Sequence, residues 1–234
     1  MPSVSVDQRY LDGSYLEANP TWGIEDAPWK AKQVRRMLQR HSLEPRTICD
    51  VGCGAGHVLR ELLSLTRAET IDGYDISPDA ARFWAGLSTD RLHFHQEDFL
   101  EAATTQYDLL LCLDVFEHVR DYIGFLQAIR GRATYKLFHI PLDISAQSVI
   151  RMTPILQNRR TFGHLHYFTT ETALVTLKDA GYEIVDYFHT ASGIERATTR
   201  AEKIARLPRW LMGLVSRNLA ARLLGGYSVL ALTR

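Results

Sequence analysis

Cysteine is scarce in this chain and follows no pattern that forms a disulfide framework or a metal site. There are 3 cysteines among 234 residues, at positions 49, 53 and 112, and no two of them form a C-x-x-C pair. This usage excludes the small disulfide-stapled scaffolds and the cysteine-rich zinc sites. We expect Cys49, Cys53 and Cys112 to be small buried apolar residues in a reducing compartment.

The sequence also lacks long apolar runs and any charge imbalance. No run of about 18 apolar residues occurs, and the first residues show no basic-then-apolar signal pattern. Lys plus Arg and Asp plus Glu number 27 each, which gives no electrostatic reason to expect a nucleic-acid partner. We expect one cytoplasmic domain, residues 1–234, because a chain of this size buries roughly 70% of its unfolded surface.

What the sequence does contain is a glycine-rich stretch at residues 48–56, ICDVGCGAG. A short apolar run ends at Asp50, glycines follow at 52, 54 and 56, and an apolar helical pattern comes next. Such a strand-to-helix turn presents bare backbone and unpaired N–H groups to a ligand. The spacing is G-x-G-x-G, whereas a dinucleotide loop has G-x-G-x-x-G. Asp50, Gly52, Gly54 and Gly56 are therefore predicted to bind a ligand.

A second acidic residue lies where a ribose would need one. Asp75 and Ile76 end a short strand that begins at Thr70, and Asp75 follows Gly56 by 19 residues. Its alternative role is structural, because Ser77 and Pro78 are good first residues of a helix that a strand-end aspartate can cap.

Two further stretches continue the series. Residues 92–100 end in Glu-Asp98-Phe99-Leu, and residues 107–114 form an apolar run that ends at Asp114. A continuous apolar run is typical of a parallel strand that is covered on both faces. The roles of Asp98, Phe99 and Asp114 at a ligand site follow from the family that these stretches resemble.

In this order, the four stretches resemble the motifs of the class I S-adenosylmethionine (SAM) dependent methyltransferases, in particular the bacterial small-molecule enzymes with a D-x-G-x-G-x-G motif. The resemblance implies SAM as cofactor, with Asp75 bonded to the ribose, Asp98 accepting from the adenine amino group and Phe99 packed on the ring. It also implies a Rossmann-like sheet of seven strands, the last one antiparallel and inserted between the fifth and sixth. A dinucleotide-dependent oxidoreductase and a SAM-binding module without catalysis stay open.

The rest of the chain continues the alternation of strand and helix. Strands are expected at 133–141, 182–189 and 227–233, and helices at 121–130 and 169–180, the second ending before Gly181. This repetition predicts an α/β fold with helices on both faces of the sheet.

The N-terminal arm and helix, residues 1–41, lie outside the minimal scaffold. A helix entered at Asp26-Ala-Pro28 follows a segment rich in aromatic residues. Trp22, Trp29 and Lys30 line the cofactor site in one interpretation, and in the other the aromatics fasten the arm to the sheet.

A second extra segment, residues 141–167, is the expected substrate cap, since it leaves the fifth strand at the ligand side of the sheet. His139, Asp143, His164 and His166 are candidates for positions near the transferred methyl. Residues 163–169 resemble the G-H-x-H-x-F-[ST] segment of bacterial small-molecule methyltransferases, although purely structural histidines stay an alternative. We expect no metal, because no carboxylate or cysteine lies at ligand spacing from His164 and His166.

The third segment, residues 196–224, is a basic and apolar insertion before the last strand. Its apolar residues recur at helical spacing, and Pro208 is expected to break or kink it into two helices. Packing on the protein's own core or on a second subunit is favoured over binding to a membrane surface.

Together these features predict transfer of a methyl group from SAM to a small-molecule acceptor, with a hydroxyl oxygen as the expected atom. His139, His164 or His166 would then serve as general base. A lipid-linked or membrane-surface acceptor is the alternative. We expect a monomer or a homodimer and no nucleic-acid partner.

Overall fold

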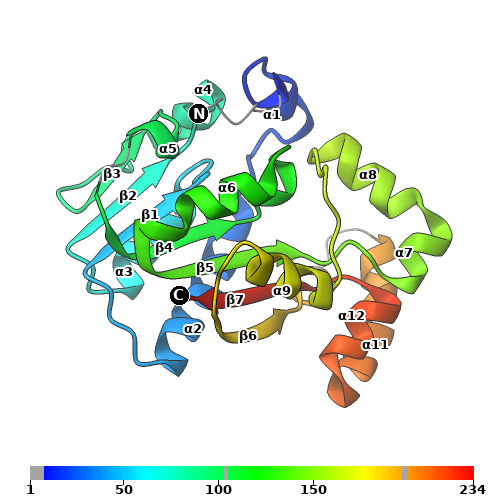
Figure 1. Ribbon diagram of the computed structural model, residues 1–234. Coiled ribbons are helices and arrows are strands. Elements are labelled where there is room, and N and C mark those ends of the chain that lie inside the picture. Colours follow the sequence, from blue (N-terminus) through cyan, green and yellow to red (C-terminus); the bar gives the residue numbers. More distant parts are fainter. Residues whose placement is uncertain (1–7, 103–104, 197–199) are drawn as a thin grey trace.

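The computed structural model describes residues 8–102, 105–196 and 200–234, and it contains one sheet of seven strands in the order β3-β2-β1-β4-β5-β7-β6. The strands are β1 Thr47–Val51, β2 Thr70–Tyr74, β3 Leu92–His95, β4 Tyr107–Leu113, β5 Ala133–Pro141, β6 Ile184–Thr190 and β7 Ser228–Thr233. Neighbours pair in parallel from β3 to β5, and β7 runs antiparallel to both β5 and β6. The expected Rossmann-like topology, with an antiparallel last strand, is confirmed (Figure 1).

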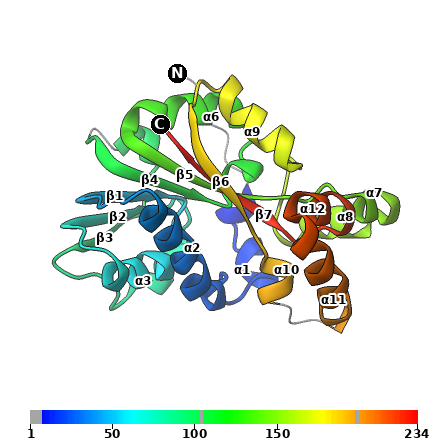
Figure 2. The same ribbon diagram turned by 90° about the horizontal axis from the view of Figure 1, so that it is seen from below.

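Helices cover both faces of the sheet (Figure 2). On one face, α2 (Ala27–Arg40) and α3 (His57–Leu65) bury residues such as Val34 and Leu59 against β1 and β4. On the other, α6 (Tyr122–Ile129) and α9 (Thr170–Asp179) bury Phe125 and Leu177. The strands between them are apolar on both sides, which is why β4 reads as a continuous apolar run.

The ends of these elements follow local rules. Thr169 and Thr172 form a capping box at the start of α9, where the Thr169 side chain accepts from the Thr172 backbone N–H. Gly181, at φ +92°, follows the helix in a conformation that favours glycine. The expected helix over 169–180 is confirmed with the boundaries shifted by one residue. Cys49, Cys53 and Cys112 are buried and free, as predicted.

The N-terminal arm crosses the ligand side of the sheet as short helical turns. These are η1 Gln8–Tyr10, α1 Ser14–Ala18 and η2 Ile24–Asp26. Ser77, which caps α4 (Pro78–Ala81), donates its hydroxyl to the Tyr10 carbonyl at 2.6 Å. Asn19 Nδ2 donates to the Thr161 carbonyl at 2.9 Å, at the end of α8 (Thr153–Thr161). The arm therefore bridges two segments far apart in the sequence.

A group of helices lies beyond the carboxyl end of β5, on the side of Figure 1 where α7, α8, α11 and α12 are labelled. The remaining helical elements are α5 Phe99–Ala102, α7 Ala146–Arg151, α10 Ser192–Glu195, α11 Arg200–Val215, α12 Arg217–Leu224, η3 Arg82–Trp84, η4 Phe116–His118 and η5 Arg130–Arg132. Within the described ranges, no helix combines the length and apolar character needed to cross a bilayer.

The predicted break at Pro208 is wrong. Helix α11 continues through Pro208 to Val215, and the two helices separate at Ser216. Ser216 has an extended backbone, with φ −159° and ψ 116°, and its hydroxyl accepts from the Leu219 N–H at 3.2 Å. Proline removes one backbone hydrogen bond of a helix, yet here the helix continues through it, and the chain leaves the helical conformation at the serine that caps the next helix.

Candidate functional site

A cavity of about 780 Å³ lies outside the carboxyl ends of β1, β4 and β5. One wall is the glycine loop after β1, and a second is formed by the N-terminal arm and α2. The opposite walls come from the segment after β5, from α7 and α8, and from the loops around α10 and α12. This is the ligand position expected for an open α/β sheet.

The glycine loop forms the floor on the β1 side. Gly52, Gly54 and Gly56 all have positive φ values, which other residues rarely adopt. At Gly54, with φ +54°, a Cβ atom would also lie 2.9 Å from the Trp22 indole. The Gly54 N–H donates to Asp75 Oδ2 at 2.8 Å, and its carbonyl accepts from Trp84 Nε1 at 2.8 Å. The loop is thus held rigidly, with an aromatic ring from the N-terminal arm above it.

Asp50, one residue before the end of β1, has an unpaired carboxylate oxygen and belongs to the cavity wall. The residue is 2% exposed, and its Oδ1 atom has no hydrogen-bond partner within the described part of the chain. Burial raises the pKa of Asp50 to about 8, although the charge of Lys30 opposes the shift. A buried carboxyl without a partner is costly, so this position suits a ligand that donates a hydrogen bond or carries positive charge.

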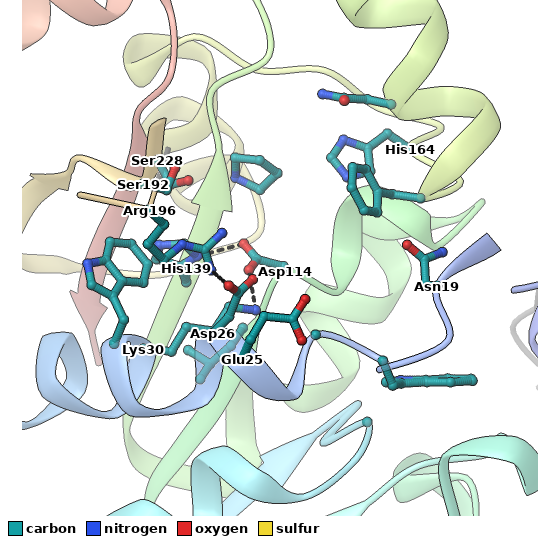
Figure 3. A pocket seen from close by; sticks show the side chains of 18 of the residues that line it. Asn19, Glu25, Asp26, Lys30, Asp114, His139, His164, Ser192, Arg196 and Ser228 are labelled. Carbon is teal, nitrogen blue, oxygen red and sulfur yellow. Dashed lines mark hydrogen bonds and ion pairs between the residues drawn. The ribbon is translucent and has the colours of Figure 1, made fainter. Parts of the chain in front are cut away.

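Asp114 connects three elements across the cavity floor (Figure 3). Its Oδ2 atom forms an ion pair with Lys30 Nζ at 2.7 Å, and its Oδ1 atom lies 2.6 Å from His139 Nδ1. His139 Nε2 in turn lies 2.9 Å from Thr190 Oγ1. The α2 helix is therefore tied to the ends of β4, β5 and β6.

Charge stabilises this chain of contacts. Burial favours the neutral form of Asp114, but His139 and Lys30 outweigh it and hold the pKa of Asp114 well below its usual range. Burial likewise opposes the charge on Lys30, yet Asp114 raises the pKa of Lys30 above its ordinary value. Both groups are ionised at neutral pH.

A second aspartate–histidine pair lines the opposite wall. Asp143 Oδ2 lies 2.5 Å from His164 Nδ1, and Asp143 Oδ1 accepts from Asn158 Nδ2 at 2.8 Å. His164 Nε2 has no hydrogen-bond partner in the ranges that the structure describes. The pair thus leaves one imidazole nitrogen available to a substrate.

Next to His164 lies a buried cluster that the sequence interpretation missed. Ligand atoms of Glu117, His118 and His164 lie within 4.8 Å of one another, an arrangement that is able to hold a metal ion. A carboxylate therefore does lie near His164 in space, although none is near it in sequence. The sequence contained a signal for this cluster, because Glu117 and His118 follow the predicted site residue Asp114 by three and four residues.

The charge states of this cluster do not require a cation. Glu117 is fully buried, and burial raises its pKa well above the ordinary range, with the charge of Asp114 adding to the shift. Burial, together with His164, lowers the pKa of His118 to about 4. Burial thus favours the neutral form of both side chains, and neutral side chains carry no charge that attracts a cation.

Several predicted residues lie outside the cavity lining. Asp75 receives backbone N–H bonds from Gly54 and, at 2.9 Å, from Ser77, so its carboxylate fastens the glycine loop. Ile76 follows it and is partly exposed. Thus Asp75, Ile76, Asp98, Phe99 and His166 do not belong to the cavity wall, whereas Asp50, Gly52, Gly54, Gly56, Asp114, His139 and His164 do.

Three of these residues outside the cavity wall, Asp98, Phe99 and His166, have contacts elsewhere in the fold. Asp98 Oδ1 accepts from the Leu100 N–H at 2.9 Å at the start of α5. Phe99 is buried, with its ring 5.1 Å from that of Tyr74. His166 Nε2 bonds to the Val119 carbonyl at 2.9 Å.

The N-terminal helix lines the cavity and is also fastened to α10. Trp22, Trp29 and Lys30 all belong to the wall. Trp29 Nε1 donates to Glu195 at 2.5 Å, and Asp26 forms an ion pair with Arg196. The two sequence interpretations of this arm are thus compatible, because the same aromatics line the cavity and fasten the arm.

A protein-family model identifies the family to which this fold belongs. Residues 26–187 match the family model of the methyltransferase domain, which is more than half of the chain. The chain belongs to the methyltransferase domain family. Its motif stretches at 48–56, 70–76, 92–100 and 107–114 all lie inside the matched region.

Curated relatives of the methyltransferase carry one name. A ubiquinone biosynthesis O-methyltransferase from Bordetella avium is 26% identical over 212 residues, covering 78% of this chain and 83% of the relative. One from Pseudomonas savastanoi pv. phaseolicola is 33% identical over 102 residues, covering 41% of this chain and 43% of the relative. The chain therefore spans less than half of the length of some of these relatives.

Among solved structures, the methyltransferase resembles the magnesium protoporphyrin IX methyltransferase from Synechocystis PCC 6803 with bound SAH. The TM-score is 0.57 at 18% sequence identity, with 88% of this chain and 82% of that chain covered. This likeness supports the fold. The family match makes the protein a SAM-dependent methyltransferase with SAM as its cofactor.

Proposed function

We propose that this methyltransferase methylates a hydroxyl oxygen of a small molecule and uses His164 as general base. The Asp143–His164 pair carries the proposal. A carboxylate on one imidazole nitrogen fixes the orientation of the ring, and the second nitrogen stays available to take a proton.

The other two histidines are less suitable as bases. Both nitrogens of His139 are occupied, by Asp114 and by Thr190. His166 bonds to a backbone carbonyl and lies outside the cavity wall. We therefore assign His139 to the support of the cavity floor and His166 to the packing of the cap.

The residues on the β1 side fit the cofactor. Asp50, with its unpaired buried oxygen, suits the cationic methionine end of SAM, and the positive-φ glycines at 52, 54 and 56 leave space for a ligand against the backbone. Asp75 and Asp98 would bond the ribose and the adenine, with Phe99 packed on the ring, as the family resemblance implies, and Ile76 would lie beside Asp75 at the cofactor site. Asp114 would lie between the cofactor and the acceptor.

Little further chemistry is required of the protein. SAM supplies an electrophilic methyl carbon, so the protein mainly has to align the acceptor oxygen with it. As the oxygen–carbon bond forms and the carbon–sulfur bond breaks, the hydroxyl proton moves to His164 Nε2. Asp143 would stabilise the resulting imidazolium, while the electron pair of the broken bond stays on the cofactor sulfur.

The relatives support a hydroxyl acceptor, because their name states O-methylation. We would incubate the protein with isotopically labelled SAM and a panel of phenols, hydroxy acids and sugars, and identify methylated products by mass spectrometry. The expected product carries the label on oxygen. Label on nitrogen or carbon would overturn the choice of acceptor atom, while micromolar affinity for NAD without affinity for SAM would contradict the cofactor site.

A further inference from the structure

Exposed apolar side chains are concentrated on the two helix pairs beyond the cavity. Of the seventeen large apolar residues exposed in the described ranges, thirteen lie in residues 146–162 and 200–224. Ile150 and Val215 are each 83% exposed, and Ile204 is 70% exposed. The thirteen are Val149, Ile150, Met152, Leu156, Phe162, Ile204, Leu207, Trp210, Leu211, Leu214, Val215, Leu219 and Leu223. The packing of the basic insertion on the protein's own core, which the sequence favoured, therefore leaves its apolar side uncovered.

The same segments hold a strong positive charge. Residues 146–162 contain three arginines and no acidic residue, and residues 200–224 contain six basic residues and one glutamate. The chain as a whole has a net charge of zero. Arg222 forms an ion pair with Glu171 of α9, at 3.0 Å, so part of this charge is compensated by a neighbour. The other basic residues make this side of the molecule more positive than the rest of it.

We propose that α7, α8, α11 and α12 form a docking surface for an anionic phospholipid bilayer. The helices are close enough to act together, since α12 contacts both α7 and α11, and α7 contacts α8 (Figure 1). A basic helix binds a bilayer in this way when it lies flat at the membrane–water interface and inserts large apolar side chains into the lipid. Each Lys or Arg near an anionic surface adds to it.

Helix α11 has the pattern that interfacial binding requires. Ile204, Leu207, Leu211 and Leu214 recur at spacings of three and four residues, so they share one side of the helix. Lys203 and Arg206 are exposed next to that side, and Trp210 is half exposed. An indole with one apolar and one polar end is suited to the boundary between lipid and water.

A second copy of the chain is a poorer occupant for this surface. In a two-fold symmetric dimer, the same patch of each subunit faces its counterpart. The basic residues of these segments would then approach their counterparts, with few carboxylates to balance them. Anionic headgroups supply the missing charge, and the bilayer interior supplies the apolar contact.

The docking surface is continuous with the cavity. Gln147 of α7, Asn158 of α8 and Arg209 of α11 all line the cavity wall, and so do Gly225 and Gly226 directly after α12. Docking would bring the cavity close to the bilayer, where an amphiphilic acceptor resides. This acceptor class rests on the proposed O-methyl transfer, whereas the docking surface itself does not.

Vesicle co-sedimentation tests the docking surface with the whole protein. Phosphatidylcholine vesicles would be compared with vesicles that contain about one-third phosphatidylglycerol, at low and at high salt. We expect binding to the anionic vesicles only, weakened by salt. Lys203→Glu/Arg206→Glu should weaken it by at least about 30-fold, since two basic side chains contribute about 1 kcal/mol each. Leu207→Glu/Leu211→Glu should abolish it.

Matched controls separate docking from folding and from catalysis. Lys32→Glu/Arg67→Glu reverses two exposed basic residues elsewhere, and Val175→Glu changes an exposed apolar residue on α9; neither should alter vesicle binding. Undiminished SAM affinity in the docking variants would show that they fold. Absence of vesicle binding by the wild type, or equal binding to both compositions, would overturn the proposal. So would a wild-type dimer that Leu207→Glu/Leu211→Glu converts to monomers, because it would make this surface a subunit interface.

Discussion

Asp143 Oδ2 lies 2.5 Å from His164 Nδ1, although 21 residues separate the two in the sequence. Asp143 follows the end of β5, and His164 follows α8. The segment between them, which contains α7 and α8, folds back and brings the two residues together. The contact orients an imidazole whose other nitrogen has no partner among the residues that the structure describes. It is the arrangement on which catalysis by a base would depend.

His164→Ala is expected to lower kcat by about 100- to 10,000-fold, the range for loss of a general base, because the group that takes the acceptor proton is removed. The dissociation constant of SAM should not change, since the glycine loop and Asp50 lie on another wall. Steady-state kinetics and calorimetry measure the two effects.

Asp143→Asn is the companion variant. An asparagine presents an N–H either to His164 or to Asn158, so the imidazole loses its acceptor or is turned, and kcat should fall without a change in SAM affinity. His139→Ala and His166→Ala are the comparison variants. If methyl transfer is undiminished in all three histidine variants, no base is used.

The Lys30–Asp114 ion pair is expected to contribute to stability as well as to the cavity floor. Lys30→Met leaves the Asp114 carboxylate without its ion-pair partner and with only the hydrogen bond to His139, so the free energy of unfolding should fall by about 1–3 kcal/mol. The pKa of Asp114 should rise at the same time. Urea unfolding measures the loss.

An exposed pair provides the control for this prediction. Arg46 and Glu69 lie 2.8 Å apart but are 73% and 59% exposed, so Arg46→Ala should lower the free energy of unfolding less than Lys30→Met does. In a double-mutant cycle, Asp114→Asn should cost less in the Lys30→Met background than in the wild type. Equal costs in both backgrounds would show that the two groups are not coupled.

The fold was predictable because its signals are local. The apolar run at 107–113, the glycines at 52, 54 and 56, and the capping threonines at 169 and 172 each determine one strand, turn or helix end from neighbouring residues. The break between α11 and α12 was not placed correctly. There, the capping serine at 216 determines the break, and the proline at 208 is accommodated within the helix.

The site was only half predictable, because its partners come from distant elements. Asp114 contacts Lys30 and His139 through three separate elements, and Glu117 meets His164 only because the cap folds over η4. No spacing in the sequence shows such contacts. Asp75 has a contact that its place in the sequence did not show, since its carboxylate accepts from the backbone N–H of Gly54; its bond to the ribose stays a prediction.

Gly54→Val is expected to abolish SAM binding and leave most of the fold intact. The residue has φ +54°, a conformation in which a β-branched side chain is strained, and its Cβ would lie 2.9 Å from Trp22. Calorimetric titration with SAM and circular dichroism separate binding from folding. Trp22→Ala should not rescue binding, because it removes the clash but not the backbone strain; rescue would assign the effect to the indole alone.

Chelation is expected to leave activity unchanged. The Glu117–His118–His164 cluster is the place where a metal would bind if one were used, but a neutral Glu117 and a neutral His118 need no cation. Activity after treatment with EDTA and removal of the chelator measures this. Loss of activity that returns with a divalent cation, and does not return in Glu117→Gln, would contradict the prediction and identify the ligands.

Because of Asp50, the free energy of unfolding of the protein without SAM should fall as pH rises. Its folded pKa is about 8, against an ordinary value of 3.8, so the folded state holds a proton that the unfolded chain has lost. The stabilising contribution is complete below pH 4 and is lost as pH rises through 8. Asp50→Asn, which resembles the neutral carboxyl, should melt at the wild-type temperature near pH 4 and at a higher temperature at pH 8.

The same carboxyl should couple SAM binding to proton release. If the cationic end of SAM lies beside Asp50, it favours the ionised form, so binding at pH 7 expels the proton that burial retains. Calorimetry in two buffers that differ in ionisation enthalpy measures the number of protons released, and Asp50→Asn should release none from this site. Equal proton release by the wild type and Asp50→Asn would place the positive charge of the cofactor away from Asp50, and the orientation of SAM in the cavity would then have to be reversed.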